Sequence, residues 1–296
     1  MKSYKQINKI LPYIYVGPVI VFLTLIFLFP LLYNFYMSLR NYSLLEPQAS
    51  KLIWFKNYMN VLFKDSIFWH SVGVTIYFSV LAVIIEIILG LILALLLNRK
   101  INTVRNIYRT IMMLPIITTP IAVAYMWRIM YAPSTGLLNY LLSLVGIKGP
   151  DWIADVGWAM PSLVIVDVWA WTPFIALMLL SGLMSLPQEP FEAAKVEGAT
   201  AWQSFWFVTL PLLKPVFLVA LLIRTIDSFK LFDIVYAMTG GGPMRATETF
   251  NFYIYITAFR YLDIGYASAL SLTLLIMIIF LSMILIKAGG MGVESS

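Results

Sequence analysis

The chain has 296 residues, of which 61% are hydrophobic and 11% are charged, and its mean hydropathy is +0.88. This composition excludes an ordinary globular protein and is typical of an integral membrane protein. The net charge of +6 would suggest nucleic-acid binding in a soluble domain, but here Lys and Arg cluster between apolar runs, where they set membrane orientation. There is no cysteine, and the single histidine, His70, cannot build a usual metal site. We therefore expect no disulfide, no metal and no cofactor bound by this chain.

Six apolar segments are long enough to cross a bilayer as helices, since a hydrocarbon core of about 30 Å needs about 20 residues. They span residues 11–39, 71–97, 110–131, 158–184, 212–237 and 266–286. The first segment is longer than a signal-peptide core and has no small-residue cleavage site after it, so we expect it to remain as a transmembrane helix. The sequence therefore predicts an all-α integral membrane protein with six transmembrane helices.

The positions of Lys and Arg predict the orientation of these helices. The N-terminal tail, 1–10, carries Lys2, Lys5 and Lys9, and the loop between the second and third segments carries four basic residues and no acid, namely Arg99, Lys100, Arg105 and Arg109. By the positive-inside tendency, this loop and both tails, 1–10 and 288–296, should be cytoplasmic. The 131–157 loop, with Lys148 against Asp151 and Asp155, fits the outer side.

Tryptophan placement also suits this orientation, because Trp54, Trp69, Trp152 and Trp158 would form an outer interfacial belt. The 40–70 loop argues against it, since four basic residues lie on the face assigned as outer, namely Arg40, Lys51, Lys56 and Lys64.

The 185–214 segment is expected in the cytoplasm, yet its sequence predicts two short helices. Pro187 and Pro190 suit a first helical turn, and Glu189 and Glu192 place negative charge near the positive end of the helix dipole. Two elbowed helices below a membrane bundle would form a coupling element. The alternative is an amphipathic or re-entrant segment that packs against the bundle.

The rest of this segment continues the pattern. Ala193 and Ala194 favour a helix without bulk, so a partner surface can approach closely, and Gly198 permits a sharp turn. The second helix, rich in Trp and Phe over 202–207, is expected to lie along the membrane interface until Leu210 and Pro211 lead into the fifth span.

Several motifs resemble the permeases of binding-protein-dependent ABC importers. In the 185–214 segment, Glu192-Ala193-Ala194, Gly198 four residues later and Leu210-Pro211 resemble the EAA loop of that family. Further motifs along the chain resemble the carbohydrate-uptake branch of this family, of the maltose-permease MalF type. They are Asn57-Tyr58, Phe68-Trp69, Leu114-Pro115, Trp127-Arg128, Gly136-Leu137-Leu138-Asn139 and Thr239-Gly240-Gly241-Gly242-Pro243. The similarity covers residues from about 10 to 287, without the extra N-terminal helices and large external domain of MalF itself.

This resemblance implies a permease subunit of an ABC importer in the bacterial inner membrane, with a transmembrane domain over 11–287 and a coupling loop over 185–214. It would form half of the translocation path for a sugar or related solute. The implied partners are a homologous second permease subunit, two ABC ATPase subunits, an external solute-binding protein and membrane lipid. ATPase coupling is assigned to Glu189, Glu192, Ala193, Ala194, Gly198, Leu210 and Pro211.

ATP and Mg would be used by the partner ATPases, because the chain contains no G-x-x-x-x-G-K-[ST] motif. No catalytic constellation of serine with histidine, paired aspartates or a His-rich metal motif is present either, which argues against a membrane enzyme. A stand-alone secondary transporter would typically show internal inverted repeats, and no convincing repeat relates the two halves.

The fifth span carries Arg224, Asp227, Lys230 and Asp233, with alternating sign every three residues. One interpretation is that these charges neutralise one another along a buried helix. The other is that they face a cavity and offer hydrogen bonds to a polyhydroxylated solute.

The fourth span places Asp167, Trp171, Phe174 and Met178 on one helical face, where aromatic rings could contact the apolar faces of sugars or simply form core. Because the resemblance implies that the helices flanking the EAA loop line the path, the predicted cavity residues are Trp171, Phe174, Arg224, Asp227, Ser228 and Leu231.

Four other ionisable positions have simpler interpretations. Glu86, in the second span, is expected to hydrogen-bond across the bundle or to the partner permease rather than to relay protons. Asp151 and Asp155 are interpreted as solvated loop acids, and His70 as an interfacial residue rather than a ligand.

Overall fold

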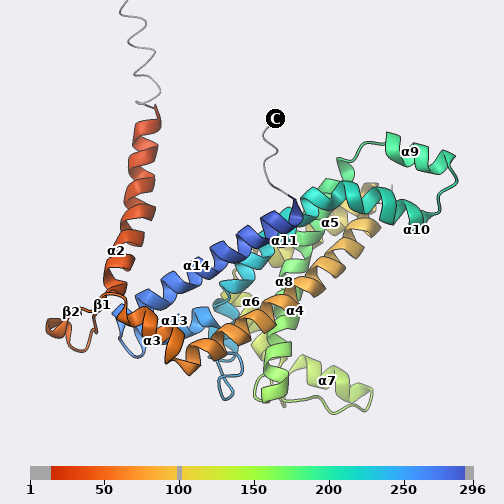
Figure 1. Cartoon of the computed structure of the whole chain (residues 1–296). Helices are drawn as coiled ribbons and strands as arrows, with labels where there is room; N and C mark the ends of the chain where they lie inside the picture. Colours follow the sequence, from red (N-terminus) through yellow and green to blue (C-terminus); the bar gives the residue numbers. More distant parts are fainter. Residues whose placement is uncertain (1–14, 99–101, 291–296) are drawn as a thin grey trace, which may run out of the picture. The chain divides into compact units, whose positions relative to one another are not determined.

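The computed structural model describes residues 15–98 and 102–290, and almost all of its regular structure is helical (Figure 1). Within these residues, five helices are long and apolar enough to cross a membrane, and a bent pair of helices can supply a sixth crossing. The chain divides into two compact units, Met1–Ser66 with Ile254–Leu275 and Ile67–Tyr253 with Ile276–Ser296.

Several predictions fall outside this description. The three lysines of the N-terminal tail, the first residues of the 11–39 segment, Arg99 and Lys100, and the end of the C-terminal tail lie outside the described residues. The side chains of Arg105 and Arg109 are not described either.

The first unit begins with an apolar helix, Tyr15–Ser38, which contains a π-helical turn, η1 (Thr24–Leu28), followed by α2 (Phe29–Ser38). After it come the antiparallel strands β1 (Arg40–Asn41) and β2 (Lys51–Leu52), the 3₁₀ turn η2 (Pro47–Ala49) between them, and α3 (Lys56–Phe63).

Hydrogen bonds from polar side chains connect the segments of this unit. Asn57 donates from Nδ2 to the carbonyls of Ser38 and Arg40, at 2.8 and 3.0 Å. The Tyr266 hydroxyl lies 2.7 Å from a carboxylate oxygen of Asp65. The 40–70 segment, expected only as a connecting loop, is therefore a folded element.

The second unit contains the remaining helices. Their bounds are α4 Ser66–Leu97, α5 Asn102–Ile117, α6 Pro120–Met130, α7 Leu137–Leu144, α8 Val156–Met184, α9 Glu189–Val196, α10 Ala201–Ser204, the π-helical turn η3 Phe205–Thr209, α11 Leu210–Phe229, α12 Asp233–Met238, α13 Phe250–Phe259 and α14 Ile264–Gly289. Helices α13 and α14 each contribute residues to both units. Of α4, only the first residue, Ser66, belongs to the first unit.

The core of the second unit lies between α4, α8 and α11, where the apolar side chains of these helices bury one another. Glycines let the helices approach closely: a Cβ atom on Gly90 of α4 would lie 2.5 Å from Ile175 Cγ2 of α8, and one on Gly182 of α8 would lie 2.9 Å from Leu213 Cδ1 of α11. Small residues at helix contacts are the usual way in which membrane helices gain packing energy.

The third span was predicted as one helix over 110–131, and the structure instead breaks it into α5 and α6, which meet at 97°. Proline explains the break. The residue before a proline avoids the helical region, and Thr119, just before Pro120, has ψ 137°. Arg128 of α6 then donates from Nη1 to the Ala237 carbonyl of α12, at 2.9 Å.

The fifth span was predicted over 212–237, but α11 ends at Phe229 and α12 begins at Asp233. Side chains satisfy the carbonyls that the break releases: Asn251 Nδ2 donates to Lys230 O at 2.8 Å, and Thr249 Oγ1 donates to Leu231 O at 3.1 Å. The break is therefore specified by residues about 20 positions away in the sequence, which a local pattern does not reveal.

Both π-helical turns directly precede a helix with proline near its start. In η1 the Phe29 N–H bonds the Thr24 carbonyl before Pro30, and in η3 the Leu210 N–H bonds the Phe205 carbonyl before Pro211. Proline offers no N–H to the preceding turn, and the wider turn keeps the helix continuous past it.

Candidate functional site

Three ionisable side chains from three helices meet in the interior of the second unit. Arg224 of α11 donates to both carboxylate oxygens of Glu86 in α4, with Nε–Oε2 at 2.5 Å and Nη2–Oε1 at 2.9 Å, and also to Asp167 of α8. All three side chains are at most 2% exposed. The guanidinium fork suits such multiple recognition of carboxylates. Glu86 thus pairs across the bundle, as its isolation within α4 predicts.

A pocket of about 230 Å³ opens beside this network. Its lining residues come from α6, α8, α11, the break after α11 and α12, and they are Pro120, Asp167, Trp171, Arg224, Asp227, Lys230, Leu231, Phe232, Asp233 and Ile234. The Arg224 guanidinium carbon lies 5.1 Å from the centre of the Trp171 ring, within cation–π range. The pocket therefore combines aromatic rings with carboxylates and cations.

A second pocket, of about 250 Å³, lies at the break in the third span. It shares Pro120, Trp171 and Ile234 with the first, and Thr118 adds a hydroxyl to an otherwise apolar lining. The breaks of the third and fifth spans both contribute to these walls. Irregular backbone at membrane depth is tolerated where it is buried in protein or lines a cavity, and broken helices often mark solute sites in transporters.

Four of the six predicted cavity residues line the first pocket, namely Trp171, Arg224, Asp227 and Leu231. The other two have different surroundings. Phe174 packs against the apolar core with its ring edge-on to Trp171, at a centroid distance of 6.0 Å. Ser228 is buried and donates to the Thr225 carbonyl at 2.9 Å.

The two interpretations of the charged fifth span both hold in part. Asp227 and Lys230 pair along the helix at 2.8 Å, as neutralisation predicts, whereas Arg224 pairs with carboxylates of two other helices. Arg224, Asp227 and Lys230 nonetheless line the pocket.

Six lining residues are absent from the set of predicted cavity residues, namely Pro120, Asp167, Lys230, Phe232, Asp233 and Ile234. Pro120 offered a signal, since a proline in the middle of an apolar segment indicates a break. Phe232 and Ile234 gave none, because their exposure to the pocket depends on the break after α11.

The 185–214 segment begins as its sequence predicts. Helix α9 has Pro190 within its first two positions, acids in its first turn and Lys195 in its last. Gly198 has a φ of +80°, the left-handed conformation that favours glycine at a sharp turn. Glu192 and Ala193 are exposed and Ala194 is half-buried, which leaves an outer face of α9 open.

The second half of this segment differs from the prediction of a separate helix along the membrane interface. Thr200 and Gln203 form a reciprocal capping box at the start of α10. From Ala201 the helix then continues through η3 and α11 to Phe229, so that Leu210 and Pro211 lie within one 29-residue helix. The turn at Gly198 thus leads, through the cap at Thr200, into the same continuous helix that carries Arg224.

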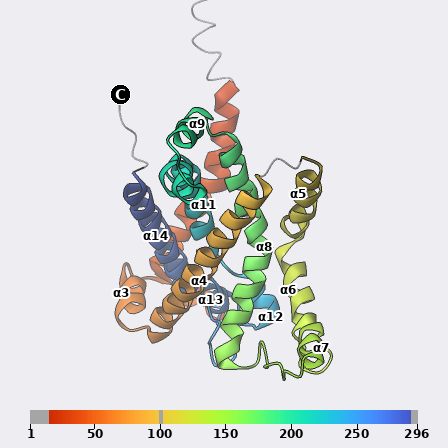
Figure 2. The ribbon, with the colours of Figure 1, turned by 90° about the vertical axis from the view of Figure 1, so that its right-hand side faces the viewer.

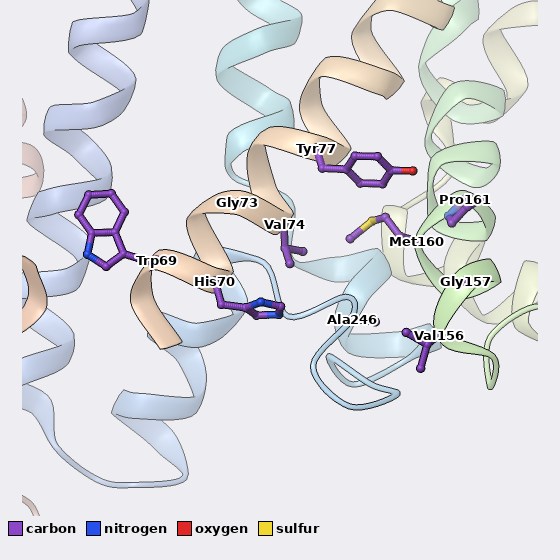
Figure 3. A pocket seen from close by; sticks show the side chains of 10 residues that line it. All are labelled: Trp69, His70, Gly73, Val74, Tyr77, Val156, Gly157, Met160, Pro161 and Ala246. Atoms are coloured by element: carbon purple, nitrogen blue, oxygen red, sulfur yellow. The ribbon is translucent and has the colours of Figure 1, made fainter. Parts of the chain in front are cut away.

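A third and larger pocket, of about 520 Å³, lies at the N-terminal ends of α4 and α8 (Figure 3). Figure 3 shows Tyr77 and Met160 on its walls, with His70 nearby. The His70 ring Nε2 lies 3.0 Å from the Arg245 carbonyl oxygen. Among residues 15–98 and 102–290, no group of three or more His, Asp or Glu side chains could hold a metal ion.

Asp155 was interpreted as a solvated loop acid. Its side chain is exposed, as that interpretation expects, and the structure adds a local role. Its carboxylate accepts hydrogen bonds from the backbone N–H groups of Gly157 and Trp158, at 2.8 and 3.1 Å, and so caps the N-terminus of α8.

The second unit combines apolar helices long enough to cross a membrane with a charged pocket among them. It also carries α9 and the turn at Gly198 beyond the end of α8. This combination is typical of a membrane transport subunit. Residues 86–288 match the family of binding-protein-dependent transport system inner membrane components, and the chain belongs to that family. It is therefore a multi-pass permease subunit of an ABC importer in an inner membrane and not itself an enzyme. As the description of the family says, such components depend on a solute-binding protein.

Individual relatives agree with this assignment. The chain is 37% identical over 282 residues to the trehalose/maltose transport system permease protein MalF of Thermococcus litoralis, covering 94% of this chain and 93% of the relative. It is 32% identical to the sn-glycerol-3-phosphate transport system permease protein UgpA of Agrobacterium fabrum, covering 95% of each. The fold matches a crystal structure of a bacterial ABC transporter involved in alginate import, with a TM-score of 0.84, 22% identity and coverage of 99% of this chain and 100% of that one.

Proposed function

We propose that this permease forms half of the translocation path for a neutral saccharide. The observation that carries the proposal is the pocket beside the buried ion network, where the Trp171 ring lies next to carboxylates. Sugars present apolar ring faces, which suit aromatic side chains, and hydroxyl groups, which donate to carboxylates. The path residues are those predicted from the sequence that line the pocket, namely Trp171, Arg224, Asp227 and Leu231, together with Asp167.

The charge of the pocket supports a neutral solute over an anionic one. Its described lining has three carboxylates, on Asp167, Asp227 and Asp233, against two cations. Both cations are already engaged: Arg224 by two carboxylates and Lys230 by Asp227. A phosphate would compete with these ion pairs, whereas a sugar hydroxyl would not. The trehalose/maltose relative is therefore a closer guide to the solute than the sn-glycerol-3-phosphate relative.

The 185–214 segment is proposed to be the coupling loop, with both chain termini on its side of the membrane in the cytoplasm. Helix α8 has 29 residues, a length of about 43 Å, which is enough to separate α7 and α9 by the bilayer. Figure 2 shows α7 and α9 at opposite ends of α8. The end of α4 and the start of α5 lie toward the α9 end of α8 in Figure 2, and the sequence between these two helices is basic, which favours the cytoplasm there.

In this mechanism, α9 is gripped by a partner ATPase, which uses ATP and Mg, while this chain binds neither. Closure of the ATPase pair moves α9, and the continuous helix from Ala201 to Phe229 transmits that movement to the pocket. The external binding protein delivers the solute to the path, which opens alternately to the outside and to the cytoplasm.

Uptake measurements test the solute. Cells or proteoliposomes that contain the complete transporter should take up radiolabelled trehalose or maltose and not sn-glycerol-3-phosphate. Trp171→Ala should abolish most uptake with normal membrane levels, whereas Trp169→Ala, on the same helix but not among the lining residues, should retain it. Preferred uptake of the phosphate ester, or equal uptake by the two variants, would contradict the proposal.

Matched glycine variants test the coupling loop. Gly198 and Gly146 both have positive φ, at +80° and +75°, and a Cβ on either would meet open space. Valine therefore imposes a similar backbone strain of about 1–2 kcal/mol at each position. Gly198→Val should lose uptake while the protein still inserts, and Gly146→Val, which lies at the other end of α8, should retain uptake. The charge reversal Glu192→Lys should act like Gly198→Val; unchanged uptake by both loop variants would contradict the coupling role.

A further inference from the structure

Helix α7 presents an apolar face outward. Leu137, Tyr140, Leu141 and Leu144 recur at i, i+3, i+4 and i+7, and each is between 48% and 65% exposed. A helix that faces water places polar residues on this stripe, so an apolar one indicates a nonaqueous neighbour.

The structure fixes which face points outward. Asn139 lies off this stripe, donates from Nδ2 to the Pro133 carbonyl at 3.0 Å and accepts a hydrogen bond from Trp152 Nε1 at 2.7 Å. Because its polar side chain is anchored to the loop, α7 is held with the leucine stripe away from its own chain.

The surroundings point to lipid as the neighbour. The preceding helix, α6, exposes Tyr125, Met126 and Ile129, so an apolar surface continues from a membrane-crossing segment toward α7. Trp158 is 45% exposed and meets the half-buried Trp152 edge-on at 5.5 Å. Tyr and Trp gather where a membrane meets water.

The residues after α7 continue this surface. Val145 and Ile147 are 69% and 54% exposed, and the exposed Lys148 follows them. An apolar stripe beside a lysine is the pattern of a helix that lies in the membrane interface, with the cation near lipid phosphates.

We infer that α7 is an interfacial helix whose leucine stripe is inserted into the headgroup–acyl boundary of the outer leaflet. It would hold the outer ends of α6 and α8 at a fixed depth in the membrane. This inference is independent of the transported solute.

Site-specific fluorescence tests it, because the chain has no cysteine and a single one can be introduced. Leu144→Cys and Ser143→Cys are each labelled with an environment-sensitive fluorophore in the complete transporter in lipid nanodiscs. Ser143 is the matched control, since it is exposed and adjacent but lies off the stripe. The Leu144 label should be quenched by lipids brominated near the headgroup more than by lipids brominated near the chain end, with iodide quenching several-fold weaker than at Ser143.

Two results would overturn the inference. One is equal iodide quenching at both labels, with no quenching by brominated lipid, which would place α7 in water. The other is a Leu144 label in the assembled transporter that iodide quenches until the solute-binding protein is added, which would assign the stripe to a protein interface.

Discussion

The buried ion network and the coupling loop are built in opposite ways. Arg224, Glu86 and Asp167 come from three helices and meet only when α4, α8 and α11 have packed. The 189–204 segment is local: proline near the start of α9, Gly198 at the turn and the Thr200 cap lie within a few residues of one another. The network therefore depends on the fold, whereas the loop shape is specified by its own sequence.

This difference predicts where substitutions act. A change in the network should act mainly on stability, because a removed partner leaves a charge buried without compensation. A change in the coupling loop should act mainly on transport, since α9 is largely exposed and is proposed to contact a partner ATPase. The Arg224 variants below test the first half of this contrast, and the glycine pair at 198 and 146 tests the second. The variants at Gly90 and Asp155 measure a close helix contact and a local cap for comparison.

The largest effect is expected from Arg224→Leu. It leaves the carboxylates of Glu86 and Asp167 in the core without their cation, at a cost of about 3–5 kcal/mol. Thermal unfolding in detergent should show a clear loss of stability. A triple variant, Arg224→Gln with Glu86→Gln and Asp167→Asn, removes all three charges together. It should be more stable than the single variant Arg224→Leu. A single variant as stable as the wild type would break the contrast between network and loop.

A smaller loss is expected from Gly90→Val. Its new Cβ would lie 2.5 Å from Ile175 Cγ2, and overpacking of this kind costs about 1–3 kcal/mol. Gly73→Val is the matched control on the same helix, because a Cβ there meets nothing within 4 Å. Equal unfolding temperatures for the two variants would mean that α4 and α8 do not approach closely at Gly90.

The smallest effect is expected at the start of α8. Asp155→Ala removes the cap and should cost about 1 kcal/mol. Asp151→Ala should stay within about 0.5 kcal/mol of the wild type, as surface substitutions usually do. The pair isolates the cap, since both acids are exposed and have the same interpretation from sequence. Indistinguishable unfolding curves would mean that the cap at Asp155 adds no stability.

The sequence predicted the features that depend on composition or on neighbouring residues. Apolar length predicted the membrane helices, and Pro190 and Gly198 predicted the start and end of α9. It did not predict the features that depend on distant residues. The break after α11 relies on Thr249 and Asn251, and the pairing of Arg224 relies on Glu86 and Asp167. Of the predicted cavity residues, Asp227 and Leu231 do line the pocket, but the sequence could not separate them from Ser228, which bonds back to its own helix.

Crosslinking from α9 tests the central claim most directly. Val196 is 88% exposed at the end of α9, so a photo-crosslinking amino acid there should reach whatever protein grips the loop. In the assembled transporter, the predicted result is a covalent adduct with the ATP-hydrolysing subunit, with none from the same amino acid at Leu144 of α7. An adduct between Val196 and the external solute-binding protein, or an ATPase adduct from Leu144, would contradict the account.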